Sequence, residues 1–168
     1  PNKEQEKRLV RLGKRKGNKL VDVTDTKEDT QEFLRHGAYR YEAGCGGLYG
    51  TITDYEHMAR MLCSNGMYQG KQFLRPETVC LMHTEAQKQH LEPEPGFTWG
   101  LSVKIRQNPE LSGSYAHKGT YGWSGAFGTH FFVCPDEKLE AVFMTNRSDL
   151  GGSGSYISEK VEELVFGS

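Results

Sequence analysis

The sequence predicts an α/β fold of the α+β type, in which a helical segment precedes an antiparallel sheet and a C-terminal helix packs on that sheet. Three observations predict it. Apolar residues recur at helical spacing within residues 51–96, and again in residues 155–166. Between these segments, two apolar runs of strand-like composition are joined by a short turn, and strands joined in this way pair antiparallel.

Length and composition bound the domain organisation. The chain has 168 residues, a size typical of one domain, but only 36% of them are apolar and 26% are charged. This apolar content is low for a domain that must bury its own core. We therefore expect one incomplete domain, made of a linking segment and glycine turn (1–50), a helical segment (51–96) and C-terminal sheet strands with a terminal helix (97–168).

The first 50 residues carry weak structural signals. Residues 3–12 are expected to form a short charged helix, and Lys19–Val23 a short strand. Residues 24–43 are polar and lack a sustained period, which indicates a loop that carries a short helix around Glu32. The glycine-dense run Gly44–Thr51 predicts a turn where the backbone passes close to another part of the molecule.

Two helices are expected in the helical segment. Thr53 and Glu56 have the spacing of a capping box, which predicts the start of the first helix. Asn65-Gly66 is expected to end it. The second helix is expected to begin at Pro76, a residue favoured in a first turn, and to end before Gln87. The apolar face of the first helix is formed by Tyr55, Met58, Met61 and Leu62.

The C-terminal segment reads as strands followed by a helix. Strands are expected at Phe97–Ile105, Thr129–Cys134 and Leu139–Asn146, and residues 135–138 (PDEK) predict a hairpin turn between the last two. A helix from about Ser155 to Phe166 is expected to cover this hairpin's sheet. Its apolar stripe is formed by Ile157, Val161, Leu164 and Val165.

Charge argues against several classes of partner. The net charge is −1, so no overall field favours nucleic acid or an anionic membrane. Basic residues are concentrated in residues 1–20, which is compatible with a phosphate-binding arm or with a solvated helix face and turn. The absence of aromatic residues among them favours the solvated face, because aromatic side chains are what stack on bases. We expect no nucleic-acid partner, and no apolar run is long enough to span a membrane.

The cysteines and histidines do not have metal-site spacing. No Cys-x-x-Cys pair occurs, and no histidine lies at ligand spacing from a cysteine, so we expect no metal and no cofactor. The even number of cysteines would permit two disulfides, but apolar surroundings favour buried free thiols in a reducing compartment such as the cytoplasm. The cysteines are Cys45, Cys63, Cys80 and Cys134.

A serine in a glycine-rich run is the first catalytic candidate. Residues 122–126 (GWSGA) approach the G-x-S-x-G pattern of a nucleophile elbow, with Ser124 at its centre. An elbow follows a buried strand and opens a helix. Here the preceding residues are polar and glycine-rich, and the following residues are strand-like, so this context argues against Ser124 as the nucleophile.

The order of motifs resembles a known family. The run GWSGAFGTHFFVCP, followed by LEAVFMTNR, resembles the third active-site motif and flanking strands of the serine β-lactamase and penicillin-binding-protein superfamily. More narrowly, it is similar to the class C-like branch that includes family VIII carboxylesterases, where W-G-G replaces K-T-G. Upstream, residues 44–82 resemble that branch's helical stretch, and residues 8–24 its linking strand. The resemblance extends from Gln5 to Phe166.

The resemblance implies a C-terminal portion of a serine acyl hydrolase of esterase, β-lactamase or DD-peptidase type. In the family, the nucleophile motif S-x-x-K and the Y-x-N motif lie upstream of the matched region, and neither occurs in these 168 residues. The chain is therefore expected to be inactive alone, with the missing N-terminal part of the same protein as its partner. The alternatives are a non-catalytic binding or regulatory module that reuses the fold, and an interaction protein that acts through its basic arm.

The resemblance also implies roles for four residues. The backbone N–H of Ala126 would be an oxyanion donor, and Gly125 would let the backbone approach the substrate. Ser124 would contact a carboxylate or acyl group of a small-molecule acyl substrate, which is an ester, amide or β-lactam. Trp123 would wall the pocket, although an aromatic at this position is also compatible with a core or rim residue. Because lactamases place Lys where this chain has Trp123, the resemblance favours an esterase-like activity.

Overall fold

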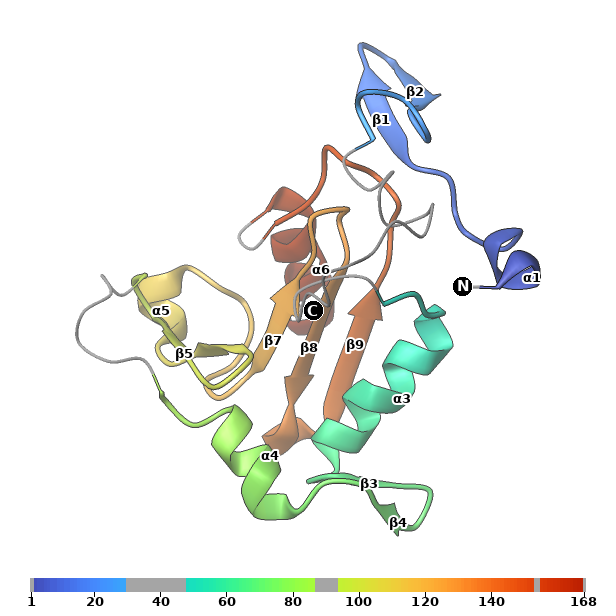
Figure 1. Cartoon of the computed structure of the whole chain (residues 1–168). Helices are drawn as coiled ribbons and strands as arrows, with labels where there is room; N and C mark the ends of the chain where they lie inside the picture. The colour runs from blue at the N-terminus through green and yellow to red at the C-terminus, as the bar shows by residue number, and fades with distance from the viewer. Residues whose placement is uncertain (1, 30–47, 87–93, 153–154, 168) are drawn as a thin grey trace.

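The computed structural model describes residues 2–29, 48–86, 94–152 and 155–167, and its centre is a five-stranded antiparallel sheet (Figure 1). The strands lie in the order β5-β6-β7-β8-β9, so each strand pairs with its neighbour in sequence. The predicted α+β class is confirmed. The strands are β5 (Phe97–Trp99), β6 (Lys104–Arg106), β7 (Tyr121–Ser124), β8 (His130–Cys134) and β9 (Leu139–Phe143).

The predicted hairpin of the last two strands is confirmed. β8 and β9 pair in register from His130 with Phe143 to Cys134 with Leu139. A short 3₁₀ turn, η1 (Pro135–Glu137), joins them, and Lys138 closes it with a φ of 54°. The strand expected at Phe97–Ile105 is instead two strands. The chain turns at residues 100–103 because Gly100 lies against the Met82 carbonyl oxygen, where a Cβ would be only 1.9 Å away.

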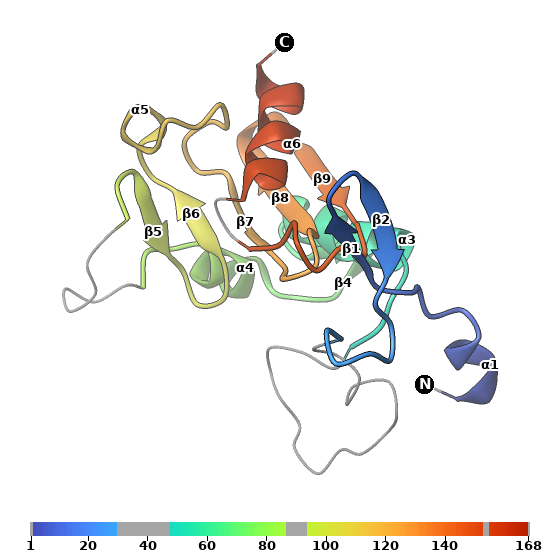
Figure 2. The same ribbon diagram turned by 90° about the horizontal axis from the view of Figure 1, so that it is seen from above.

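Helices cover both faces of the sheet (Figures 1 and 2). On one face lie α3 (Ile52–Cys63) and α4 (Pro76–Met82), whose apolar side chains pack on β6, β7 and β8. On the other face lies α6 (Tyr156–Phe166). The core on the α3 side is formed by Ala59, Leu62, Val79, Val103, Ile105, Tyr121, Phe131 and Val133.

The start of α3 differs from the prediction. The cap is Thr51, whose hydroxyl accepts a hydrogen bond from the Asp54 N–H, while the Asp54 carboxylate accepts one from the Thr51 N–H. The expected pair of Thr53 and Glu56 lies inside the helix, where Glu56 instead contacts Arg60 one turn later. The capping motif is therefore shifted by two residues, because the extended backbone at Thr51 ends the turn that precedes the helix.

The helix expected over residues 3–12 is shorter than predicted. Helix α1 covers only Lys3–Glu6 and buries none of its residues. Strands β1 (Gly13–Lys16) and β2 (Lys19–Asp22) then form a hairpin, which confirms the strand expected at Lys19–Val23. The short helix expected around Glu32 lies outside the described residues.

Several short elements were not expected, among them β1 and also β7, the strand that carries Trp123 and Ser124. A small hairpin, β3 (Met67–Tyr68) and β4 (Lys71–Gln72), follows α3, and α5 (Pro109–Ser112) lies between β6 and β7. All are too short to leave a periodic apolar pattern.

The cysteines are partly as expected. Among the described residues all are free thiols, with Cys134 buried and Cys63 half-buried, but Cys80 is exposed because it lies on the outer side of α4.

The face that α6 buries also differs from the prediction. The helix has the expected bounds, but its buried side chains are Ser158 and Glu162, whereas Leu164 is 78% exposed. The reason is that Glu162 has charged and polar partners on the sheet, which are described below. A polar anchor therefore takes the place that the apolar stripe was expected to fill.

Candidate functional site

The candidate site lies at the end of β7, where one edge of the strand is open. β7 pairs with β8 along its whole length, from Tyr121 to Ser124. It pairs with β6 only at Tyr121 and Gly122. Trp123 and Ser124 therefore lie beyond the end of β6, at a notch in the sheet. Successive side chains of a strand point to opposite faces, so Tyr121 faces α3 and Ser124 faces α6. Trp123 lies at the notch itself and lines the same cavity as Ser124.

Trp123 is an exposed aromatic at this notch. Its side chain is 40% exposed, and its ring packs at 60° against the ring of Trp99, with 4.5 Å between the centroids. Trp99 is held by its own backbone, since its carbonyl accepts a hydrogen bond from the Ala86 N–H at 2.7 Å. The two rings form a rigid apolar surface beside the open edge of β7.

A tight turn follows Ser124, and the N–H groups of Ala126, Phe127 and Thr129 in it have no partner among the described residues. The Gly125 N–H donates to the Thr129 carbonyl at 2.8 Å, and the Gly128 N–H donates to the Gly125 carbonyl at 3.2 Å. Ala126 is the second residue of this turn, and its N–H has no partner among the described residues. Ala126 is also an exposed residue.

The segment before α6 supports the turn from behind. The Gly152 N–H donates to the Gly125 carbonyl at 3.1 Å, and the Arg147 N–H donates to the Phe127 carbonyl at 3.2 Å. Gly151 lies so close to Ala126 that an added Cβ would be 1.7 Å from the Ala126 carbonyl oxygen. These contacts hold the backbone around Gly125 and Ala126, and the close approach explains why a glycine stands at position 151.

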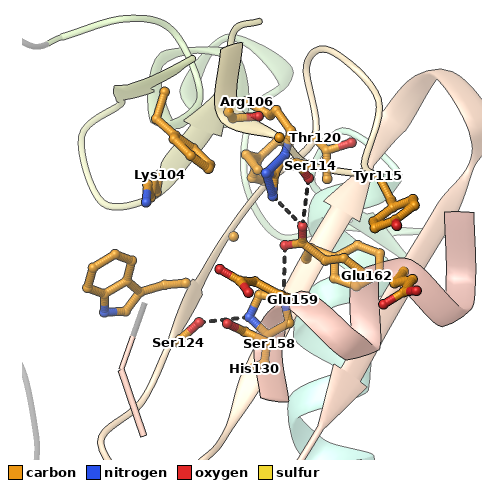
Figure 3. Close-up of a pocket in the computed structure, with 18 of the residues that line it drawn as sticks. Lys104, Arg106, Ser114, Tyr115, Thr120, Ser124, His130, Ser158, Glu159 and Glu162 are labelled. Carbon is orange, nitrogen blue, oxygen red and sulfur yellow. Dashed lines mark hydrogen bonds and ion pairs between the residues drawn. The ribbon is translucent and has the colours of Figure 1, made fainter. Parts of the chain in front are cut away.

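On the α6 face, Ser124 begins a chain of buried hydrogen bonds (Figure 3). The Ser124 Oγ lies 2.8 Å from the His130 Nδ1, and the His130 Nε2 lies 3.2 Å from Glu162 Oε1. Ser124 and His130 are direct cross-strand partners, while Glu162 comes from α6. The predicted contact of the Ser124 hydroxyl with substrate stays a prediction; in the structure this hydroxyl is bonded to His130.

Glu162 joins this chain to two further segments. Its Oε2 accepts hydrogen bonds from the Arg106 guanidinium at 2.5 Å and from the Ser114 hydroxyl at 3.0 Å. Burial alone would raise the pKa of Glu162, but the hydrogen bonds from His130 and Arg106 and the Arg106 charge lower it to about 2. Glu162 is therefore an ionised acceptor that ties α6 to β6 and β8.

This network was not predicted from the sequence. Neither His130 nor Glu162 was singled out as a site residue. One signal was available: Glu162 lies one turn beyond Ser158 on the helix, so these two polar side chains share one face of it.

A cavity of about 330 Å³ opens between α6 and strands β6 and β7, and the network lines one wall of it (Figure 3). Arg106 Nε and Thr120 Oγ1 also line it, and both atoms are buried without a hydrogen-bond partner in the part of the chain that the structure describes. Unpaired buried polar atoms are costly, so this face is a place where a polar group from elsewhere would be stabilised.

The ionised Glu162 predicts how stability depends on pH. The pKa of Glu162 is lower in the folded state than in the unfolded chain. The stabilisation that its carboxylate provides is therefore present above about pH 4.5 and is lost as the pH falls toward about 2. In urea unfolding, the free energy advantage of the wild type over Glu162→Gln should be largest near pH 6 and should shrink near pH 3. Glu159→Gln, on the exposed side of the same helix, is the control. An advantage of equal size at both pH values would contradict the prediction.

Two kinds of feature are absent from the described ranges. No helix there combines the length and apolar character that crossing a bilayer requires. No set of three or more His, Cys, Asp or Glu side chains is grouped as metal ligands there.

Comparisons with known proteins agree on a family. A family model described as Beta-lactamase matches residues 1–165. Protein Rv1367c of Mycobacterium tuberculosis (strain ATCC 25618 / H37Rv) is 32% identical over 110 residues, which cover 59% of this chain and 27% of that protein. Esterase EstB of Burkholderia gladioli is 26% identical over 116 residues, which cover 68% of this chain and 28% of that protein.

Solved structures share the fold. EstCE1, described as a hydrolase with promiscuous acyltransferase activity, superposes with a TM-score of 0.75 and 22% identity, covering 94% of this chain and 43% of that one. A mutant of the simvastatin synthase LovD from Aspergillus terreus has a TM-score of 0.75 and 15% identity, covering 99% of this chain and 44% of that one. The chain thus spans less than half of the length of these two solved proteins. It spans about a quarter of the length of the curated relatives, 27% for the first of them.

Proposed function

Because this chain belongs to the beta-lactamase family, in the branch of class C β-lactamases and family VIII carboxylesterases, we propose that it forms one wall of a serine acyl-hydrolase active site. The family consists of serine hydrolases. The observation that carries the proposal is that Ala126, an exposed residue in the turn just beyond the open end of β7, has an N–H without a partner among the described residues. A backbone donor held in this way suits the negative charge that develops on a carbonyl oxygen during acyl transfer.

Three residues are assigned roles on the cleft side. The Ala126 N–H donates to the oxyanion, and the missing side chain of Gly125 lets the substrate carbonyl approach the backbone. Trp123 presents its exposed ring to the acyl or alcohol part of the substrate, backed by Trp99. Ser124 belongs to the same strand end, and its backbone joins the wall while its hydroxyl is bonded to His130.

The substrate class proposed is a small ester. Trp123 occupies the position where lactamases of the family place Lys, so the wall offers an apolar ring instead of a cation for a substrate carboxylate. The similarity to the esterase EstB and to the hydrolase EstCE1 supports an ester as the substrate. Amides and β-lactams are the alternative substrates to be tested beside it.

The nucleophile is proposed to come from the rest of the protein. A covalent acyl transfer needs a serine activated by a neighbouring base. The family's S-x-x-K and Y-x-N motifs are absent from the 168 residues. This chain alone is therefore proposed to be inactive, and the intact protein to be the hydrolase.

One observation favours a second candidate, in which Ser124 is itself the nucleophile. The chain Ser124–His130–Glu162 has the order of a serine, a base and an orienting carboxylate. Against it stand the burial of Ser124, which is 8% exposed, and the position of the free Ala126 N–H on the turn beyond it. We place this candidate second for that reason.

Covalent labelling separates the two candidates. The isolated chain, incubated with a p-nitrophenyl ester or a chromogenic cephalosporin, is expected to release no burst of product and to show no mass increase. The intact protein is expected to gain an acyl group on the serine of its S-x-x-K motif. An adduct on the isolated chain that is lost in Ser124→Ala would establish the second candidate. An intact protein without acyl-transfer activity would instead support a non-catalytic module.

A further inference from the structure

The polar network on the α6 face ends at the residue that precedes the proposed oxyanion turn. Ser124 is the last residue of β7, and Gly125 and Ala126 follow it directly. The hydrogen bond from Ser124 to its cross-strand partner His130 spans the base of this turn at 2.8 Å. The direction of the turn as it leaves the sheet is therefore linked to the side chains behind it.

Glu162 holds this linkage in place from three directions. It accepts hydrogen bonds from His130 on β8, from Arg106 on β6 and from Ser114 in the loop after α5. All of these groups are buried or partly buried, so breaking one bond would leave a polar or charged atom unpaired. Such a network has one strongly favoured arrangement and resists small shifts.

His130 links the two ends of the network. Its Nδ1 shares a hydrogen bond with the Ser124 hydroxyl at 2.8 Å, and its Nε2 lies 3.2 Å from the ionised Glu162 carboxylate. His130 and Glu162 line the same cavity as Trp123 and Ser124, but both side chains are buried and each is engaged in the network.

We propose that His130 and Glu162 are positioning residues that hold the Ala126 N–H in its catalytic position, acting through Ser124. The inference rests on the proposed function, since it concerns the donor assigned there. An oxyanion donor is effective only when it is placed to within about 0.5 Å, and residues behind it usually provide that accuracy. In this proposal α6 has a part in catalysis through Glu162, which is buried beneath the strand end that carries Ser124.

The test uses the intact protein and the variant His130→Phe, which keeps an aromatic ring but removes both nitrogen atoms. We expect kcat for a p-nitrophenyl ester to fall by about ten- to a hundredfold while KM stays unchanged, because the donor acts mainly in the transition state. We also expect the affinity for a boronic acid inhibitor, whose tetrahedral adduct places an oxygen at the oxyanion donor, to fall by a similar factor. His130→Gln, which keeps one donor and one acceptor, should recover part of both.

His117→Phe is the matched control, because His117 also pairs with a glutamate, Glu137, but lies exposed at the surface. Thermal unfolding of each variant shows that it is folded. If His130→Phe does not fold, the same measurements on Glu162→Gln and His130→Gln replace it. Folded variants of His130 and Glu162 with the kcat and boronic acid affinity of His117→Phe would overturn the inference. An inactive wild type would instead overturn the proposed function.

Discussion

In the intact protein, Gly125→Pro is expected to lower kcat by a factor on the order of a hundred or more. Proline has no N–H, so the hydrogen bond from Gly125 to the Thr129 carbonyl, which closes the hairpin at 2.8 Å, is lost. A Cβ at this position would also lie 2.2 Å from Thr129 Oγ1. Both effects displace Ala126, the next residue, whose N–H is the proposed oxyanion donor.

The measurement is steady-state hydrolysis of a p-nitrophenyl ester, with circular dichroism to confirm that the variant is folded. Gly50→Ala is the control, because Gly50 is exposed and an added Cβ there meets no atom within 4 Å. Its kcat should match that of the wild type. A folded Gly125→Pro that retains wild-type turnover would show that this turn does not carry the oxyanion donor.

Phe132→Ala is expected to reduce the free energy of unfolding of the chain by about 3–5 kcal/mol. The Phe132 side chain is 1% exposed in the centre of the sheet, on the α6 face. Its ring lies 5.3 Å from the ring of Phe166 and 5.6 Å from the His130 imidazole, measured between centroids. Truncation therefore removes the main apolar contact between α6 and β8 and leaves a void beside the polar network.

Urea unfolding followed by circular dichroism measures this loss. Phe73→Ala is the matched control, because Phe73 is 56% exposed and its change should stay within about 0.5 kcal/mol. A loss at Phe132 no larger than the loss at Phe73 would mean that α6 is held on the sheet by the Glu162 network alone. That result would leave the sheet hairpin intact but would contradict the packing described for the helix.

The sequence by itself determined the features that depend on neighbouring residues. The β8–β9 hairpin followed from two apolar runs and a PDEK turn, and the bounds of α6 followed from its apolar repeat and the glycine loop before it. The order of the motifs around Trp123 also indicated the family to which the chain belongs. In each case the signal lies within a short segment, where local geometry decides the outcome.

The tertiary structure alone decided which side chains meet. Apolar periodicity placed Leu164 on the buried face of α6, but Glu162 is buried there because its partners Arg106 and His130 lie on the sheet. These partners lie 56 and 32 residues away in the chain, beyond any local pattern. Likewise, Ser124 could be judged as a nucleophile or a wall residue from its neighbours, but not as the partner of His130. A buried charge takes the position where its opposite charge and donors are, and only the folded chain brings those groups together.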